Sequence, residues 1–570
     1  MYASDVEFPG KYGEIIETGY VRTQKIVRVA LYPVQFNPAK KTLKVFSDFQ
    51  ISVSFSNPTS PVNKELGIFR NMMHHVAINY ELSGISASSK GFFIPSGNQL
   101  NKKNMVTSGS VNRVTNLDLL VDPNPMSVDY LVITHQSLFN STNLTSLANH
   151  RSSNNKFDVV IVKVDDIYNN PKYPSSTTTR YISIRDFIGD VYANGTANHT
   201  YDGHLGYIVL VGDALQDDNS TKMVPAAYPD FYGTLEKAGD YYYACTGGDS
   251  DNLMDLMYGR ISVGNDTELS NVVNKTIAYE NSSSGSWRNN ISFMSFSPWF
   301  FDDDADCDQE FKTMAQTIPR SYYISYAWRG FAADTAQAHG RQYFSHHFFD
   351  QESDVLIPDE ADEMWQALHT GWKWYDTNYP PNERWRYGGA YGNPDSLCSS
   401  DLIDTWLYDK INAGQHTFIY EGHGRRGSLG ASEGIPRTIF RVDEIQSELT
   451  NSNMYPFIIS NCCETGWFDT NSADLGSVDC IGEAVVNLQN AGAIGFLGST
   501  RDSNIGAFGI VDQRIIEAMH EDLSHVMGEA VMESKLNIYS QMYRRQYNLY
   551  GDPAVNLCPY GFTVSEDVTL

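Results

Sequence analysis

Short apolar runs, separated by stretches with helical spacing, dominate the chain from residue 128 onward. They include VDYLVITH (128–135), FDVVIVKV (157–164), GYIVLVGDA (206–214), HTFIYEG (416–422) and YPFIISN (455–461). Val- and Ile-rich strands that alternate with helices are typical of a mostly parallel sheet buried on both faces. The pattern therefore predicts an α/β fold, in which ligands bind beyond the carboxyl ends of the strands.

The first part of the chain has a different pattern. Residues 20–56 alternate apolar and polar positions around the turn signal NPAKK, as expected of a β-rich region. Residues 82–127 are rich in Ser, Gly, Asn and Lys and are interpreted as a flexible linker with a processing site. We therefore divide the chain into a β-rich region at 1–81, a linker at 82–127 and an α/β domain at 128–560. Residues 330–395 break the strand–helix rhythm and are interpreted as an insertion.

The charge and composition of the chain argue against nucleic acid as a partner and against a membrane-spanning segment. The 570 residues carry 68 acidic and 41 basic side chains, a formal net charge of −27. Such a surface repels nucleic acid, so no nucleic-acid partner is expected. No apolar stretch reaches the roughly 20 residues needed to span a bilayer. The start, MYASDVEFPG, has no signal-peptide pattern, but nine Asn-x-Ser/Thr sequons fit a secreted or cell-surface protein.

Two predicted strands end in residues capable of nucleophilic chemistry. His423 lies between Gly422 and Gly424 directly after one strand, and Cys462 and Cys463 follow the next strand. The intervening VDEIQSELTN has the length and composition of a connecting helix, so the two strands should be parallel neighbours. A nearby imidazole lowers the pKa of a thiol and later protonates a leaving amine. The sequence therefore predicts a Cys–His dyad.

The glycines beside the predicted dyad suit an oxyanion hole. Glycine allows backbone N–H groups to approach a bound carbonyl oxygen. The natural donors are the N–H groups of Gly424 and of the cysteine itself. These residues alone do not decide whether Cys462 or Cys463 is the nucleophile.

Six motifs in order over residues 128–560 resemble the gingipain family of cysteine peptidases, secreted enzymes with a caspase-like fold. They are GYIVLVGDA, GDYYYACTGGDSDNLMDLMYGRISV, YEGHG, LTNSNMYPFIISNCCETGWF, the Cys–x–x–Glu–Ala context at 480–484, and NLYGDPAVNL. The family has a Gly three residues and a Phe five residues after its nucleophile. Gly466 and Phe468 therefore select Cys463, with His423 as its partner and Gly424 and Cys463 as oxyanion donors.

The resemblance also implies a caspase-like, mostly parallel sheet flanked by helices, preceded by a small β-rich prodomain-like region. This region is interpreted as a partial prodomain that inhibits the enzyme until it is cut away. We expect self-cleavage in the linker, near Lys102-Lys103 or Arg113.

An acidic residue lines the S1 pocket of family members that cleave after basic residues. Asp306 lies closest to that position, with alternatives at Asp302, Asp303, Asp304 and Asp308. Two departures from the family pattern weaken the implied preference for basic residues. The family's third catalytic residue, a Glu, has no equivalent at Phe296-Ser297-Pro298, and the S1 tryptophan corresponds to about Ile505. A preference for Arg or Lys is thus an open expectation.

A candidate calcium loop lies in GGDSDNLMD, with Asp249, Asp251 and Asp255 as ligands. The loop lacks the Gly and the final Glu of an EF-hand, and a solvated acidic loop is the alternative. The expected metal is a structural calcium, with no cofactor required for catalysis.

The sequence leads to one main function and several alternatives. We predict a secreted cysteine endopeptidase, made as a self-processed zymogen, that acts on protein or peptide substrates. The alternatives are a sortase-like transpeptidase of the same family and a non-catalytic glycan- or peptide-binding protein. Ser432 in GASEG matches a nucleophile elbow, but it lacks the preceding strand that such an elbow needs. His pairs at 74–75 and 345–346 lack companion zinc ligands at usable spacing.

Overall fold

A computed structural model of the chain describes most of the two predicted regions. It describes residues 5–22, 24–46, 72–73, 76–77, 109–122, 124–174, 180–197, 203–214, 224–227, 238–247, 251–282, 285–296, 314, 317–318, 323–328, 331–332, 373–375, 385–387, 407–430, 439–469, 479–503, 510–520 and 524–558. Most of the predicted insertion at 330–395 therefore lies outside the described residues.

A twelve-stranded sheet forms the centre of the α/β domain. Its order is β12-β11-β10-β15-β18-β19-β20-β9-β8-β6-β7-β5. In this order the strands are β12 (Phe331–Ala332), β11 (Tyr323–Trp328), β10 (Asn290–Phe296), β15 (Thr417–Gly422), β18 (Phe457–Asn461), β19 (Gly495–Ser499), β20 (Tyr547–Tyr550), β9 (Met257–Ile261), β8 (Tyr207–Val211), β6 (Tyr130–Thr134), β7 (Val159–Lys163) and β5 (Val111–Arg113).

The sheet consists of two parallel halves that run in opposite directions. β10, β11, β15, β18 and β19 are mutually parallel, and so are β5 to β9. Between the halves, β20 runs antiparallel to β19 and parallel to β9. The amino ends of β8 and β9 therefore open toward the same edge as the carboxyl ends of β15 and β18. The predicted class, a mostly parallel α/β sheet with helices, is confirmed; the reversal between its halves was not predicted.

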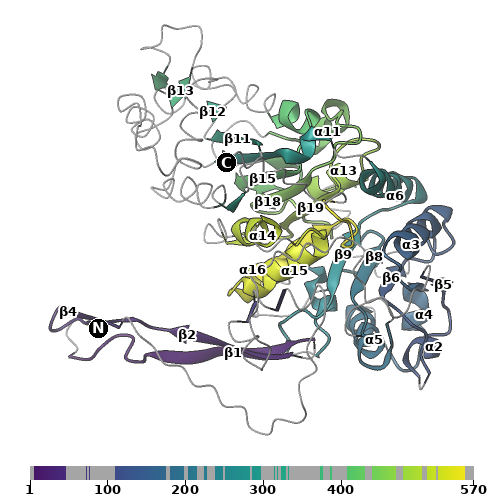
Figure 1. Ribbon diagram of the computed structural model, residues 1–570, viewed down its shortest axis with the longest axis horizontal. Coiled ribbons are helices and arrows are strands. Elements are labelled where there is room, and N and C mark those ends of the chain that lie inside the picture. Colours follow the sequence, from purple (N-terminus) through teal and green to yellow (C-terminus); the bar gives the residue numbers. More distant parts are fainter. Residues whose placement is uncertain are drawn as a thin grey trace, which may run out of the picture.

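Helices lie on both faces of this sheet (Figure 1). They are α2 (Asp118–Val121), α3 (Thr142–Asn154), α4 (Val164–Tyr168), α5 (Arg180–Asn194), η2 (Asp240–Ala244), α6 (Asp266–Asn281), η3 (Ser286–Asn289), α11 (Val442–Glu448), α13 (Ile481–Asn487), α14 (Val511–His520), α15 (Met527–Asn537) and α16 (Gln541–Gln546).

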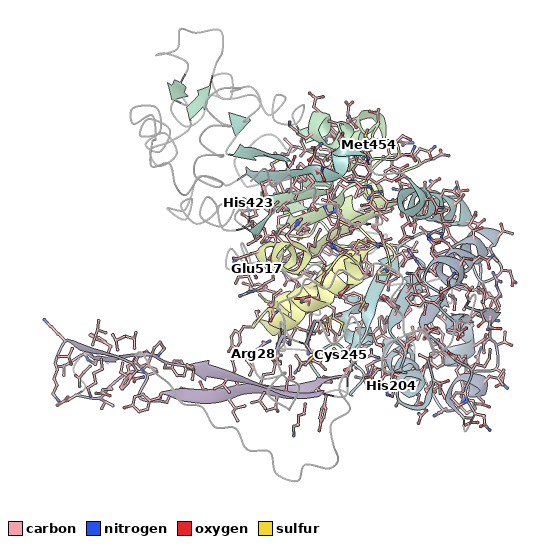
Figure 2. All side chains as sticks on the ribbon, viewed as in Figure 1. Arg28, His204, Cys245, His423, Met454 and Glu517 are labelled. Carbon is pink, nitrogen blue, oxygen red and sulfur yellow. The ribbon has the colours of Figure 1, made fainter. Side chains whose placement is uncertain are left out.

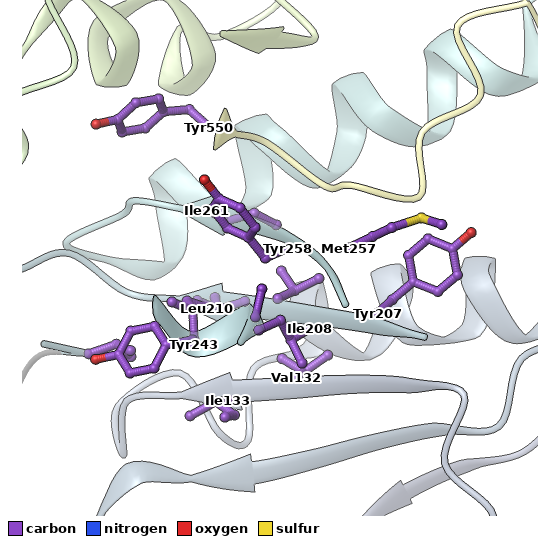
Figure 3. Packing of buried hydrophobic residues seen from close by; sticks show 14 of the residues in the cluster. Val132, Ile133, Tyr207, Ile208, Leu210, Tyr243, Met257, Tyr258, Ile261 and Tyr550 are labelled. Carbon is purple, nitrogen blue, oxygen red and sulfur yellow. The ribbon is translucent and has the colours of Figure 1, made fainter. Parts of the chain in front are cut away.

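Alternation along the central strands divides the core into two apolar clusters. Phe418 of β15 packs in the cluster that includes Ile445 of α11, whereas its neighbour Ile419 packs with Ile515 of α14. Figure 3 shows the first cluster in the other half of the sheet, where Val132 and neighbouring residues are buried between the layers. The continuous apolar character of these strands follows from burial on both faces. In the described part of the chain, no helix has the length and apolar character that crossing a membrane requires.

The N-terminal region is a β ribbon whose tip lies against the α/β domain (Figure 1). β1 (Gly13–Val21) pairs antiparallel with β2 (Gln24–Leu31), and β3 (Val34–Asn37) pairs with β4 (Thr42–Val45). The turn between β3 and β4 contains the predicted NPAKK signal. The β-rich character predicted for this region is confirmed.

The C-terminal part of the predicted linker is not a linker. Within 82–127, residues 111–113 form the edge strand β5, and Asp118–Val121 form α2. Leu117 and Leu120 are buried in the core. The Ser-, Gly- and Asn-rich residues before position 110 dominated the average composition and concealed this apolar pattern. The remainder, 82–108, lies outside the described residues.

Candidate active site

The predicted histidine and cysteine follow adjacent parallel strands. β15 pairs with β18 in a register that sets Glu421 opposite Asn461. His423 and Cys463 each follow two residues later, so they occupy equivalent positions beyond the ends of these strands. α11 connects the two strands, as its sequence predicted. Figure 2 shows His423 at the edge of the domain where these strands end.

Both glycines around His423 are required by the local backbone. Gly422 has a φ of 149°, which side-chain-bearing residues rarely adopt. A Cβ on Gly424 would lie 2.4 Å from Cys462 Sγ and 2.8 Å from the carbonyl oxygen of Cys463. The two loops are therefore in direct contact, and this contact depends on the absence of a side chain at position 424.

The two adjacent cysteines have different surroundings. Cys462 is fully buried, and its Sγ lies 3.2 Å from Ser460 Oγ and 3.6 Å from Thr465 Oγ1. Burial raises the pKa of the Cys462 thiol to about 12, which disfavours the thiolate. Cys463 is only partly buried. Of the two thiols, Cys463 is the one that a substrate could reach.

A backbone donor contacts the sulfur of Cys463. The N–H of Ser503 donates to Cys463 Sγ over 3.2 Å, and Cys463 Sγ donates to the carbonyl oxygen of Ser503 over 3.4 Å. The hydroxyl of Ser503 lies 2.8 Å from Tyr547 OH, and Tyr547 OH donates to Asn461 Oδ1. A hydrogen-bonded chain thus runs from the sulfur back to the strand that carries it. The N–H donor favours the thiolate, whereas the carbonyl oxygen of Ser503 accepts from the thiol form.

Buried carboxyl groups continue this chain beneath the loops. Asn461 Nδ2 donates to Asp512 Oδ1 over 3.3 Å, and the Asp512 side chain shares a hydrogen bond with Glu421. All three side chains are fully buried. Burial raises the pKa of Asp512. The polar cluster therefore joins β15 and β18 directly below His423 and Cys463, a feature that strand-end motifs alone did not reveal.

The residue after Cys463 has an uncommon backbone conformation. Glu464 has a φ of 61°, in the left-handed region that non-glycine residues rarely adopt. Its N–H donates to the carbonyl oxygen of Arg501 (3.2 Å), and Arg501 forms two hydrogen bonds with buried Asp469 (2.7 and 2.6 Å). Burial and the neighbouring Asp502 raise the pKa of Glu464. These contacts hold the turn that presents Cys463.

The histidine loop is also fixed by hydrogen bonds. The carbonyl oxygen of His423 accepts from Tyr420 OH (2.7 Å) and from Gly430 N–H (2.8 Å), while Gly424 pairs with Leu429. Because hydrogen-bonded pairs alternate along an antiparallel ladder, the N–H of Gly424 points away from Leu429. Burial lowers the pKa of His423 below its usual 6.5, which favours the neutral imidazole.

The structure describes only some of the residues predicted for substrate or calcium binding. Asp306 and Asp249 lie outside the described residues, as does Ser432. Asp251 accepts hydrogen bonds from two backbone N–H groups in its own loop, and Asp255 accepts from Thr246 and from the N-terminal ribbon. The described residues hold no group of three or more His, Cys, Asp or Glu side chains arranged for a metal ion. The calcium site stays a prediction.

Two motifs noticed in the sequence form buried ion pairs. Asp240 of GDYYY receives two hydrogen bonds from Arg260 of the GR pair, at 2.7 and 2.8 Å. Asp552 of the GDP motif accepts from Arg151 Nε over 2.7 Å. All four side chains are fully buried. Their role in this structure is to join distant segments of the α/β domain.

Comparison with known families identifies the class of protein. The model of peptidase family C25 matches residues 124–558, and the model of the C25 propeptide matches residues 1–87. The chain therefore belongs to peptidase family C25, the gingipain family, and is a cysteine endopeptidase that carries its propeptide region. The predictions of family and enzyme class are confirmed.

Solved structures with similarity to this chain are distant. One is described as the Arg-specific cysteine proteinase gingipain R, with 18% identity, a TM-score of 0.49, and coverage of 75% of this chain and 78% of that one. Another is a complex of RgpB pro- and mature domains from Porphyromonas gingivalis, with 17% identity, a TM-score of 0.48, and coverage of 75% and 79%. A comparison with curated protein sequences finds no match.

Proposed function

We propose that this family C25 enzyme hydrolyses peptide bonds through Cys463 and His423. The observation that carries the proposal is the register of β15 and β18, which brings the GHG loop against the Cys462–Cys463 segment. Cys463 rather than Cys462 is the nucleophile because its thiol is only partly buried.

The reaction follows from these positions. His423 accepts the thiol proton, and Cys463 Sγ attacks the scissile carbonyl carbon. The N–H groups of Gly424 and Cys463 stabilise the oxyanion. His423 then gives the proton to the leaving amine as the C–N bond breaks, and water hydrolyses the acyl-enzyme. The N–H of Ser503 favours the thiolate, and the lowered pKa of His423 keeps its imidazole neutral and able to accept a proton.

Three finer properties belong to the same proposal. Asp306 binds the basic P1 side chain of substrates cleaved after Arg or Lys; gingipain R, to which this chain is similar, is described as Arg-specific. The enzyme is secreted, and the prodomain inhibits it until it is removed, a process that begins with cleavage near Lys102-Lys103. Arg113 is a poor cleavage site because it lies in β5 and donates to Phe139 O (2.7 Å) and Thr145 Oγ1 (2.6 Å).

Paired cysteine variants test the catalytic assignment. Cys463→Ala should abolish cleavage of a peptide library randomised at P1 and abolish self-processing seen by mass spectrometry. Cys462→Ala removes a neighbouring buried thiol and should retain most activity. Full activity of Cys463→Ala would overturn the proposal.

Replacing Asp306 by Asn should reduce cleavage after Arg and Lys selectively; equal losses for all P1 residues would refute the proposed role of Asp306 in P1 binding.

A further inference from the structure

An arginine at the tip of the N-terminal ribbon is buried in the catalytic domain. Arg22 connects β1 and β2, and it is 4% exposed. Its guanidinium donates to the carbonyl oxygens of Leu205 (3.1 Å), Asp255 (2.8 Å) and His204 (3.4 Å). It also lies 5.2 Å from the centre of the Tyr192 ring. The donors of this planar group are thus matched by fixed acceptors and one aromatic face.

The backbone of the ribbon tip is recognised as well. The N–H of Arg22 donates to the carboxylate of Asp255 over 2.5 Å, and the other oxygen of that carboxylate accepts from Thr246 N–H and Oγ1. Arg22 has a φ of 53°, which turns the chain tightly enough for this contact. Gly19 approaches Leu253 so closely that a Cβ would lie 2.6 Å from Leu253 Cδ1. The pocket therefore fits the tip of a hairpin and not only a cationic side chain.

Further contacts attach the stem of the ribbon. Arg28 donates to the carbonyl oxygens of Leu536 (2.6 Å) and Ile538 (3.1 Å), at the end of α15. Glu17 accepts two hydrogen bonds from Arg544, at 2.8 and 2.9 Å. Figure 2 shows Arg28 at the border between ribbon and domain.

The Arg22 pocket and the Cys463–His423 dyad open toward the same edge of the sheet but lie in different halves of it. Leu205 and Asp255 lie two residues before β8 and β9, respectively. Because the two halves of the sheet are reversed, these amino ends open toward the edge that carries Cys463. β19 and β20 separate β18 from β9, so the pocket is distinct from the proposed peptidase site.

We propose that this pocket is an exosite that recognises an arginine-tipped β hairpin and keeps the prodomain bound after the linker is cut. The inference builds on the proposed function, since it concerns how the zymogen of that peptidase is held. The anchoring is non-covalent, and it combines the buried hydrogen bonds of Arg22 with the burial of Val21 in the apolar core. Cleavage of the linker alone therefore leaves a complex, and activation requires the loss or destruction of the ribbon.

The experiment measures dissociation in the full chain. Cys463→Ala prevents self-processing, and a recognition sequence for a highly specific added protease replaces residues within 94–100. The chain is immobilised by an N-terminal tag and cut, and loss of the catalytic domain is followed by biolayer interferometry. The parent should stay assembled. Arg22→Gln should raise the dissociation rate by roughly tenfold to a hundredfold, because buried acceptors lose their donors.

Two further variants separate recognition from general effects. Lys44→Gln makes the same change of charge at an exposed residue that contacts Glu7 within the ribbon, and it should not alter the rate. Arg22→Lys keeps the charge without the planar donors and should give an intermediate rate. Melting of each uncut variant checks folding. Immediate dissociation of the cut parent, or equal rates for Arg22→Gln and Lys44→Gln, would overturn the exosite. Since this chain is inactive, failure of the peptidase assignment would not affect the result.

Discussion

The backbone of one glycine controls how closely the two catalytic loops approach. Gly424 faces Cys462 Sγ and the carbonyl oxygen of Cys463, leaving no space for a methyl group. We expect Gly424→Ala to displace one loop and lower kcat/KM by roughly tenfold to a hundredfold, since small misplacements of reacting groups are costly. Gly427 lies in the same hairpin with nothing within 4 Å of an added Cβ. Gly427→Ala should therefore retain activity, and similar losses in both variants would contradict this account.

The acid side of the pH profile should report the state of His423. Burial disfavours the imidazolium and lowers the pKa of His423 below 6.5. The neutral base therefore persists as the pH falls to 6.5, and activity is lost only at lower pH, as the ring becomes protonated. We expect the acidic limb of kcat/KM to have its midpoint below 6.5. The measurement is kcat/KM for one peptide across pH 4–9, and a midpoint clearly above 6.5 would contradict the assignment.

At the scale of elements, the hydrogen-bonded chain from Cys463 to Asn461 links β18 and β20. Tyr547→Phe removes the hydroxyl between Ser503 and Asn461 and should release the loop that donates to the sulfur. We expect kcat/KM to fall roughly tenfold and the pKa of the Cys463 thiol to rise. The rate of iodoacetamide alkylation against pH measures that pKa, with Cys463→Ala as background.

A buried tyrosine in another part of the core provides the control. Tyr279 of α6 is fully buried and donates to the carbonyl oxygen of Leu557 over 3.1 Å. Tyr279→Phe should lower stability without shifting the alkylation profile. If both variants change the profile equally, the role of Tyr547 is general packing and not the positioning of Cys463.

The sequence could predict the elements of the site but not their surroundings. Strand ends and a connecting helix are local signals, so the adjacency of the His423 and Cys463 loops was predictable. The polar cluster of Asn461, Asp512 and Glu421 joins residues from separate strands and helices, and no local pattern reveals such a contact. The choice of Cys463 over Cys462 depended on family spacing, whereas the structure distinguishes the two by burial.

At the scale of the whole molecule, the same limit applies to contacts between distant segments. Asp255 lies in the candidate calcium loop, and its carboxylate accepts from Arg22, which lies 233 residues away in sequence. Residues 111–113 have no partner strand nearby in sequence and pair with β7 only in the folded sheet. Contacts over such separations arise from tertiary packing, so composition around a residue cannot predict them.

Long-range packing also determines what the GDP motif does. Arg151 of α3 is fully buried between Asp552 (2.7 Å) and Glu280 of α6 (2.8 Å), so the motif joins both helices to the end of β20. Asp552→Asn would leave this guanidinium with one carboxylate in a fully buried site. Breaking a buried pair costs about 3–5 kcal/mol of unfolding free energy, whereas exposed pairs contribute about 0–1 kcal/mol.

Asp443→Asn, which breaks an exposed pair with Arg441, is the matched control. Urea unfolding of both variants in the Cys463→Ala background should show a large loss for Asp552→Asn only; equal midpoints would mean that this buried pair does not stabilise the fold.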